Sequence, residues 1–309
     1  MGLVTGRASK SLVVALVAFL LVAAATWGIS RQVRSALSLV HPSRHRVADD
    51  VARRAFSEID NLQNVVFRTS DGLSIRGWFS PGRRRAGVIL VHGLMGNRAT
   101  LEPEAAVLAH HGYAILLFDL RAEGDSDGHL ATWGDREQND VEAALDYVSA
   151  RPEIDPKRIA LLGFSIGGST VVMVAARDPR VRAVILYATW TSLRDEIRTN
   201  YSRWGPLSWV PTWLTMRASG VDFENVRPID FVASVAPRPL LMIAGGHDED
   251  TPVSIMRKVF ARAGEPKQLW VVPEAGHGGV FQARPSEYES RVASFLDSSI
   301  GKDPPDGTE

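Results

Sequence analysis

A serine flanked by glycines is the first feature of this sequence that suggests chemistry. The segment GFSIGG, residues 163–168, places Ser165 where an apolar, strand-like stretch meets a helix-like one. A tight turn between a strand and a helix exposes a serine hydroxyl, and glycines allow the two elements to approach closely. The position of the motif between these two stretches, more than the motif itself, predicts Ser165 as a nucleophile.

A serine hydroxyl needs a base to take its proton, and the base needs a third group to orient it. Eight histidines are present. His277, in the glycine-rich segment EAGHGG after the last strand-like stretch, is the predicted base. His247 is the main competitor for the role of base, but it comes too soon after the end of the strand-like stretch PLLMIAGG. His92 more closely fits a structural role in an earlier loop.

The elements that must position these residues alternate between strands and helices. A hairpin over 65–80, turning at Asp71-Gly72, is followed by six apolar strands, and helical patterns stand between or after most of these. The apolar strands are AGVILVHG, YAILLFDL, RIALLGFS, VRAVILYA, PLLMIAGG and KQLWVVPEA. Strands that are apolar throughout, each followed by a helix, predict an α/β fold whose mostly parallel, eight-stranded sheet is covered on both faces.

Four stretches of this sequence resemble the α/β-hydrolase superfamily, particularly its bacterial esterase, dienelactone-hydrolase-like and serine-aminopeptidase-like branches. They are HGLMGN, FDLRAEGDSDG, GFSIGG, and the pair GGHDEDTP and EAGHGG. The resemblance extends from about Val65 to Leu296. One departure is Ala122, which stands where many relatives have glycine in an R-G-x-G-x-S segment. That segment is usually structural, so the departure casts little doubt on the chemistry.

The resemblance implies roles for further residues. The acid of a Ser-His-Asp triad becomes Asp248, which stands four residues before a proline, with Asp250 as the alternative and Glu249 as a weaker third choice. The backbone amides of Leu94 and Ile166 would form an oxyanion hole, with Met95 as a neighbouring possibility.

The implied activity is that of a serine hydrolase that cleaves carboxylic esters through an acyl-enzyme. A serine-aminopeptidase-like peptidase, a thioesterase and a lysophospholipase use the same machinery and stay open as alternatives. A non-catalytic, membrane-anchored binding protein on the same fold is an alternative of another class. The resemblance and the absence of metal-binding or dinucleotide motifs predict that the protein needs no cofactor and no metal.

The long connection between the strand ending near residue 189 and the one starting near 238 predicts a cap insertion at about 190–236. It contains half of the eight tryptophans in the chain, namely Trp190, Trp204, Trp209 and Trp213. These side chains are candidates for lining a substrate pocket or for resting on a bilayer. Burial against the edge of the sheet is the simpler alternative.

The first residues differ from all that follows. Residues 11–30 form an uncharged run of 20 residues, long enough as a helix to cross a bilayer. We expect a single-pass membrane anchor of undetermined orientation. A cleaved signal sequence, leaving a secreted or periplasmic protein, is the alternative, because Ala23-Ala24-Ala25 offers a cleavage pattern.

These patterns divide the chain into an anchor or signal segment (1–31), an amphipathic connector (32–61), a hydrolase domain (62–300) and a disordered tail (301–309). Lysine plus arginine equals aspartate plus glutamate at 35 each, which argues against nucleic acid as a partner. The expected partners are a small acyl ester or lipid-like substrate and the membrane. The lack of cysteine excludes a disulfide scaffold and a thiolate nucleophile.

Overall fold

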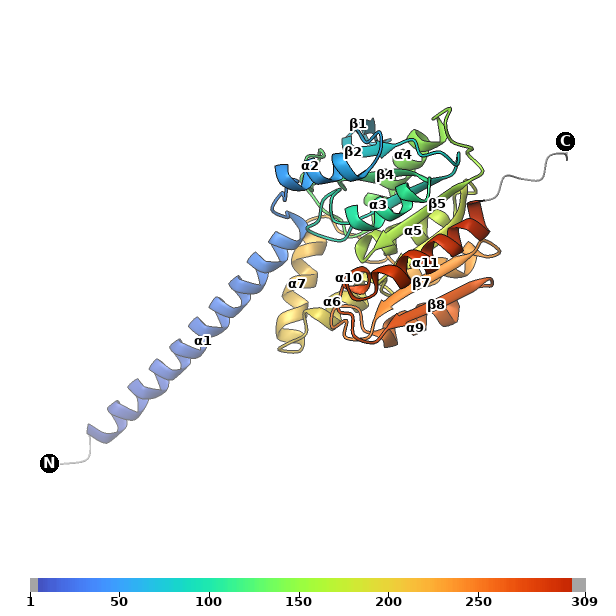
Figure 1. Ribbon diagram of the computed structural model, residues 1–309. Coiled ribbons are helices and arrows are strands. Elements are labelled where there is room, and N and C mark those ends of the chain that lie inside the picture. The colour runs from blue at the N-terminus through green and yellow to red at the C-terminus, as the bar shows by residue number, and fades with distance from the viewer. Residues whose placement is uncertain (1–4, 302–309) are drawn as a thin grey trace.

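The structure is a computed structural model that describes residues 5–301, with side chains from residue 12 onward. Most of the tail predicted to be disordered, residues 302–309, lies outside the described residues. Figure 1 shows a compact α/β body from which one long helix extends.

An eight-stranded sheet in the order β1-β2-β4-β3-β5-β6-β7-β8 forms the centre of the body. The first two strands pair antiparallel, β2 also pairs antiparallel with β4, and the remaining pairs are parallel. This confirms the predicted mostly parallel sheet and the hairpin at its edge. The strands are β1 (Gln63–Arg68), β2 (Ser74–Ser80), β3 (Gly87–Val91), β4 (Ala114–Phe118), β5 (Ile159–Phe164), β6 (Val181–Tyr187), β7 (Leu240–Gly245) and β8 (Lys267–Val272).

Helices cover both faces of the sheet (Figure 1). They are α1 (Thr5–Val40), α2 (Asp49–Glu58), α3 (Glu102–His110), α4 (Glu137–Ser149), α5 (Ile166–Ala175), α6 (Leu193–Asn200), α7 (Pro206–Ala218), α8 (Pro228–Phe231), α9 (Val253–Arg262), α10 (Val280–Ala283) and α11 (Pro285–Leu296), with short turns η1 (Val232–Val235) and η2 (Asp297–Gly301).

Two hydrophobic cores explain why the central strands are apolar throughout. In β3, Ile89 and Val91 belong to the core under α4 and α5, whereas Val88 and Leu90 belong to the core under α3 and α11. Successive side chains of a strand point to opposite faces, so a strand covered on both faces needs apolar residues at every position.

The predicted cap insertion corresponds to the helices between β6 and β7. It comprises α6, α7, α8 and η1, and Figure 1 shows α7 lying beside the body next to α1. We refer to α6 and α7, with the turn between them, as the cap.

The end of α1 is part of the folded body. Ala36, Leu39 and Val40 are buried in the same core as α4 and α5. The indole N–H of Trp133 donates to the carbonyl of Leu39 at 3.1 Å, and Ala131 N–H donates to the carbonyl of Val40 at 2.8 Å. Residues 32–40 therefore prolong α1 instead of starting the amphipathic connector, and α2 follows as a short separate helix.

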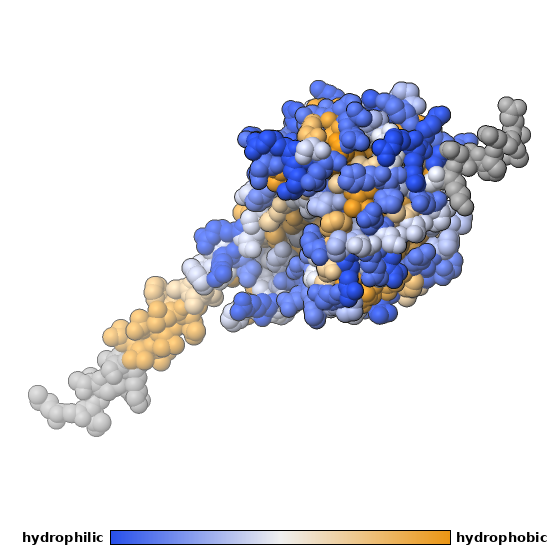
Figure 2. Space-filling model, in the orientation of Figure 1, coloured by the Kyte–Doolittle hydropathy of each residue, from blue (hydrophilic) through white to orange (hydrophobic). Residues whose placement is uncertain are grey.

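The remainder of α1 is exposed and apolar. The helix as a whole is the one candidate membrane span among the described residues, Leu12–Val40, and its most apolar window has no buried residue. Figure 2 shows this stretch as an orange band, separated from the body by a paler and bluer segment. Such a helix fits a membrane anchor or a signal sequence.

Candidate active site

Ser165 lies on the sharp turn between β5 and α5. Its φ of 55° falls in the left-handed region, which a serine adopts only when its surroundings enforce it. A Cβ atom on Gly163 would lie 2.4 Å from the carbonyl of Gly167, and one on Gly167 would lie 2.2 Å from the carbonyl of Val91. The glycines of the GFSIGG segment are thus required by close backbone contacts, as the motif predicts.

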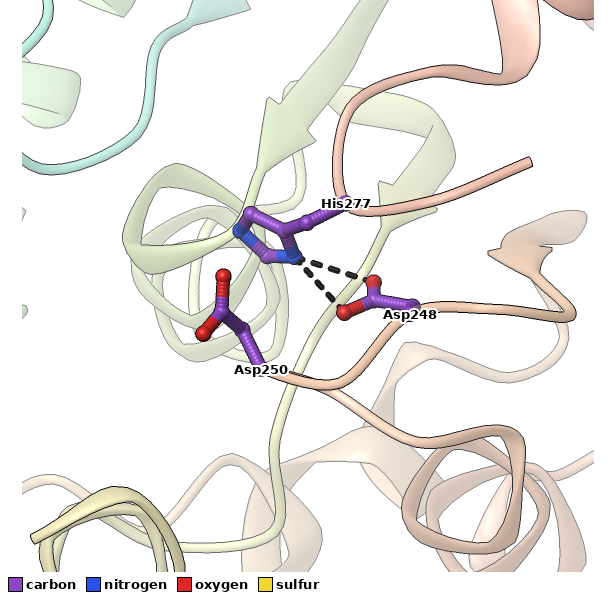
Figure 3. Close-up of side chains that lie close together, drawn as sticks. All are labelled: Asp248, Asp250 and His277. Atoms are coloured by element: carbon purple, nitrogen blue, oxygen red, sulfur yellow. Dashed lines mark hydrogen bonds and ion pairs between the residues drawn. The ribbon is translucent and has the colours of Figure 1, made fainter.

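The predicted serine, histidine and aspartate come together at the carboxyl ends of three parallel strands. Ser165 follows β5, Asp248 follows β7 and His277 follows β8. Nε2 of His277 lies 3.2 Å from Oγ of Ser165. Nδ1 of His277 lies 2.9 Å from Oδ2 and 3.1 Å from Oδ1 of Asp248 (Figure 3). These contacts link a hydroxyl, an imidazole and a carboxylate in series.

Asp248 is held more firmly than Asp250, the alternative acid. Asp248 is buried, and its Oδ1 also accepts a hydrogen bond of 2.7 Å from the backbone N–H of Thr251. Asp250 is exposed, and Figure 3 shows its carboxylate turned toward the imidazole of His277 without a hydrogen bond between them. The geometry favours Asp248 as the orienting group.

Asp248, Asp250 and His277 also offer donor atoms within 4.8 Å of one another, as a metal site would. Both oxygens of Asp248 and Nδ1 of His277 already make hydrogen bonds within the protein. A metal ion would have to break the pairing that orients the imidazole. The arrangement fits an acid-base pair better than a metal centre.

The cap contributes a buried carboxylate that the sequence interpretation missed. Glu196, on α6, is 9% exposed, and its Oε1 accepts a hydrogen bond of 2.5 Å from Nδ2 of Asn200. The same amide group donates to the carbonyl of Asp250 at 3.1 Å. Burial raises the pKa of Glu196 to about 7, and its charge interacts with that of His277. The spacing of 196 and 200 is helical, but nothing in the sequence places α6 beside the histidine.

The electrostatic surroundings of His277 make it a stronger base. Burial lowers its pKa, but the hydrogen bond and charge of Asp248, together with the charges of Asp250 and Glu196, outweigh burial and raise the pKa above its ordinary value. The ring also lies 4.8 Å from the ring of Phe164, centroid to centroid. An imidazole with a raised pKa is charged over more of the acidic range and must lose that proton before it can act as a base.

We expect kcat/KM to fall as the pH is lowered through a pKa above about 6.5, the ordinary value for histidine. In the Glu196→Gln variant this acid limb should move to lower pH, by a fraction of a unit, because Glu196, with a pKa of about 7, carries part of a negative charge near the imidazolium in this range and glutamine carries none. Glu224→Gln is the matched control, since Glu224 lies in the same insertion but is exposed and paired with Arg194. An unchanged limb in Glu196→Gln would show that Glu196 does not influence the base.

Two backbone amides near Ser165 are available to a substrate oxygen. The N–H of Ile166 is at the N-terminal end of α5, and neither it nor the N–H of Leu94 has an acceptor among the described residues. The N–H of Met95, by contrast, donates to Oε1 of the buried Glu123 at 2.7 Å. This contact favours Leu94 over Met95 as the second donor.

Buried polar contacts hold the loop that carries Leu94. Nε2 of His92 accepts from the N–H of Leu120 at 3.0 Å, so Nδ1 carries the proton and donates to the carbonyl of Gly93 at 2.6 Å. His92 therefore has the structural role expected of it. Nearby, Ala122 has a φ of 62°, which explains why glycine is common at this position in relatives.

The four tryptophans of the insertion do not share one environment. Trp190 is 2% exposed and packs in the core, 6.2 Å from the ring of Trp133, so it follows the simpler alternative of burial and not the predicted pocket. Trp209 and Trp213 are partly buried and lie under the guanidinium groups of arginines. Trp204 is 68% exposed.

Comparison with known families decides the classification. The sequence model of the prolyl oligopeptidase family matches residues 99–303, about two thirds of the chain, including the elbow, the acid loop and the histidine loop. The chain belongs to this family. The prolyl oligopeptidase family shares the α/β-hydrolase fold seen here, so the chain is a serine hydrolase of the α/β-hydrolase superfamily.

Individual relatives agree with membership of the prolyl oligopeptidase family. Protein Rv2307c of Mycobacterium tuberculosis is 33% identical over 219 residues, covering 70% of this chain and 72% of the relative. Protein YfhR of Escherichia coli is 31% identical over 249 residues, covering 78% and 82%. Among solved structures, the esterase Pf2001 of Pyrococcus furiosus superimposes with a TM-score of 0.71 at 25% identity, covering 85% of this chain and 99% of the esterase.

Proposed function

We propose that the protein is a carboxylesterase that works through an acyl-enzyme on Ser165, with His277 as base and Asp248 as the group that orients it. The observation that carries the proposal is the series of contacts from Oγ of Ser165 through the imidazole to the Asp248 carboxylate. The unoccupied amides of Leu94 and Ile166 support it, because a tetrahedral intermediate needs donors for its negative oxygen.

The reaction follows from these positions. Nε2 of His277 takes the hydroxyl proton while Oγ of Ser165 bonds to the carbonyl carbon. The two amides hold the oxyanion, each lowering the barrier by roughly 3 kcal/mol. The imidazolium then returns its proton to the departing alkoxide as the C–O bond breaks. Water attacks the acyl-enzyme, His277 accepts its proton, and the acid leaves as Ser165 regains its hydrogen.

Two observations favour an ester as substrate. The fold superimposes on the Pyrococcus furiosus esterase over nearly the whole of that enzyme. The insertion beside the site is rich in aromatic and aliphatic residues, which suits an apolar acyl group.

A peptidase with a preference for a free amino terminus is the second candidate. The family model is that of a peptidase family, and the carboxylates of Glu196 and Asp250 lie close enough to His277 to interact electrostatically with it. Their negative charges would favour a substrate with an ammonium group near the scissile bond.

An assay of the full-length protein on matched substrates separates the two candidates. We expect 4-nitrophenyl esters of graded acyl length to be cleaved with a higher kcat/KM than the 4-nitroanilides of amino acids. The Ser165→Ala variant is the control for non-enzymatic hydrolysis. Cleavage of the anilides without a preference for esters would replace the esterase proposal with the peptidase.

We further propose that α1 keeps the protein on a membrane as a single-pass anchor. Burial of Ala36, Leu39 and Val40 supports this proposal, because it joins the exposed apolar helix directly to the core of the hydrolase. The proposed enzyme needs a small acyl ester and water, and no cofactor, metal or nucleic acid.

A further inference from the structure

The cap presents an apolar stripe to solvent. Outside α1, few large hydrophobic side chains of the described chain are exposed, and three of them belong to the cap. Leu207 is 79% exposed, Trp204 is 68% exposed and Leu214 is 52% exposed. Leu207 and Leu214 are seven residues apart and therefore lie on the same side of α7. Trp204, three residues before Leu207, precedes the start of the helix. We call these three residues the cap stripe.

The helix that carries most of the cap stripe, α7, lies beside the end of α1. The C-terminal ends of the two helices meet at one place. A Cβ atom on Gly220, just after α7, would lie 3.8 Å from Leu130, and the next residue, Ala131, donates to the carbonyl of Val40 at the end of α1. The two helices pack together, and Figure 1 shows both of them running from this meeting point toward the same side of the body. The N-terminal end of α7 therefore points to the side on which α1 extends.

The lengths of the two helices match this arrangement. At about 1.5 Å per residue, the 13 residues of α7 span roughly 20 Å, the distance that α1 covers between Val40 and about Trp27. Trp27 lies near the end of the uncharged run, and tryptophan is common at membrane surfaces. The start of α7 is thus close to the level at which α1 would enter a bilayer.

Unpaired basic residues lie beside the same region. Arg31 and Arg34 follow the apolar run of α1, and Arg203 and Arg217 flank the cap stripe. Within residues 5–301, none of these four forms a salt bridge. Arg31 and Arg217 instead lie over the rings of Trp27 and Trp213. Arg31 beside Trp27 lies at the level of the start of α7 and suits anionic lipid headgroups, whereas Arg217 lies at the other end of α7.

We propose that the cap stripe rests on the anionic surface of the bilayer that α1 enters, so that the enzyme takes amphiphilic esters directly from the membrane. The substrate part of this inference rests on the proposed esterase function. Helix α6 connects the cap stripe to the active site. It precedes the cap stripe in the chain, and its Asn200 donates to the carbonyl of Asp250 in the acid loop. The cap thereby contacts the loop beside the base while its outer side contacts lipid.

A fluorescent label tests the docking without any need for catalysis. The chain has no cysteine, so Leu207→Cys accepts a nitrobenzoxadiazole dye at one site, and Val66→Cys on the distant β1 is the matched exposed control. Each full-length variant is reconstituted into phosphatidylcholine vesicles with or without phosphatidylglycerol, and a headgroup-region nitroxide lipid is added. We expect strong quenching at position 207, greater with phosphatidylglycerol, and little at position 66. Equal quenching at the two positions overturns the docking.

A pair of substrates tests the consequence for catalysis. In Leu207→Ser/Leu214→Ser we expect hydrolysis of a long-chain monoacylglycerol in the same vesicles to fall about tenfold, because apolar contact with the bilayer is lost. Hydrolysis of soluble 4-nitrophenyl butyrate should stay within about twofold, since both side chains are on the surface. Val66→Ser should change neither rate.

The outcomes separate the two proposals. If the double variant keeps the wild-type rate on the vesicle ester, or loses both activities equally, delivery of substrate from the membrane is contradicted. If the wild type cleaves neither ester, the esterase proposal fails, and the label experiment still decides whether the cap stripe contacts lipid.

Discussion

Replacing Ser165 with alanine should lower kcat for ester hydrolysis by on the order of 10⁶-fold, because the group that forms the covalent intermediate is lost. The change removes one oxygen atom from a turn that alanine can occupy at similar cost, so folding should be preserved. Stopped and continuous assays on a short-chain 4-nitrophenyl ester measure the loss. Circular dichroism and thermal unfolding compare the variant with the wild type.

Ser126→Ala is a useful comparison for this result. Ser126 lies in the loop after β4 and not in the turn that carries Ser165. It is buried, and its hydroxyl donates to the carbonyl of Asp119 in the same loop. We expect this variant to lose some stability, about 1 kcal/mol, and to retain most of its activity. A Ser165→Ala protein that kept full esterase activity would remove the basis of the proposed mechanism.

The second large effect is expected at the acid. Asp248→Asn should lower kcat by about 10⁴-fold, because an amide neither stabilises the imidazolium nor holds the imidazole with its proton on Nδ1. Asp250→Asn is the matched control, since the same chemical change is made two residues away on a carboxylate that has no hydrogen bond to His277. We expect this control to lose less than about tenfold in kcat/KM and to lower the pKa of the acid limb.

The two aspartate variants also decide between the two interpretations of the acid loop. If Asp250→Asn proved inactive and Asp248→Asn active, the acid would be Asp250, and the loop would have to rearrange around the substrate. Comparable losses in both would indicate that the two carboxylates act together on the imidazole.

Much of the fold follows from local sequence patterns. Apolar runs such as GVILV in β3 are hard to mistake for other elements, because both faces of the strand are buried. Val88 and Ile89 belong to different cores, which explains why polar and apolar residues do not alternate. The elbow is predictable because Gly163 and Gly167 meet backbone atoms that leave no room for a side chain. The order of serine, acid and histidine then follows from strand order in a parallel sheet.

The parts that escaped prediction depend on long-range packing. Glu196 becomes a neighbour of His277 only because α6 folds back over the acid loop, and its local sequence is that of an ordinary surface helix. Trp190 and Trp204 have the same side chain, yet one is in the core and the other is exposed. The continuation of α1 into the core likewise depends on contacts with Trp133, nearly a hundred residues away.

The central claim is that Ser165 is activated by His277 to form a covalent intermediate. Reaction of the full-length protein with a fluorophosphonate probe, followed by peptide mass mapping, tests it most directly. We expect a single modified peptide carrying the probe on Ser165 in the wild type, and strongly slowed labelling in His277→Ala. A correctly folded wild type that fails to react, or reacts at another serine, would contradict the account.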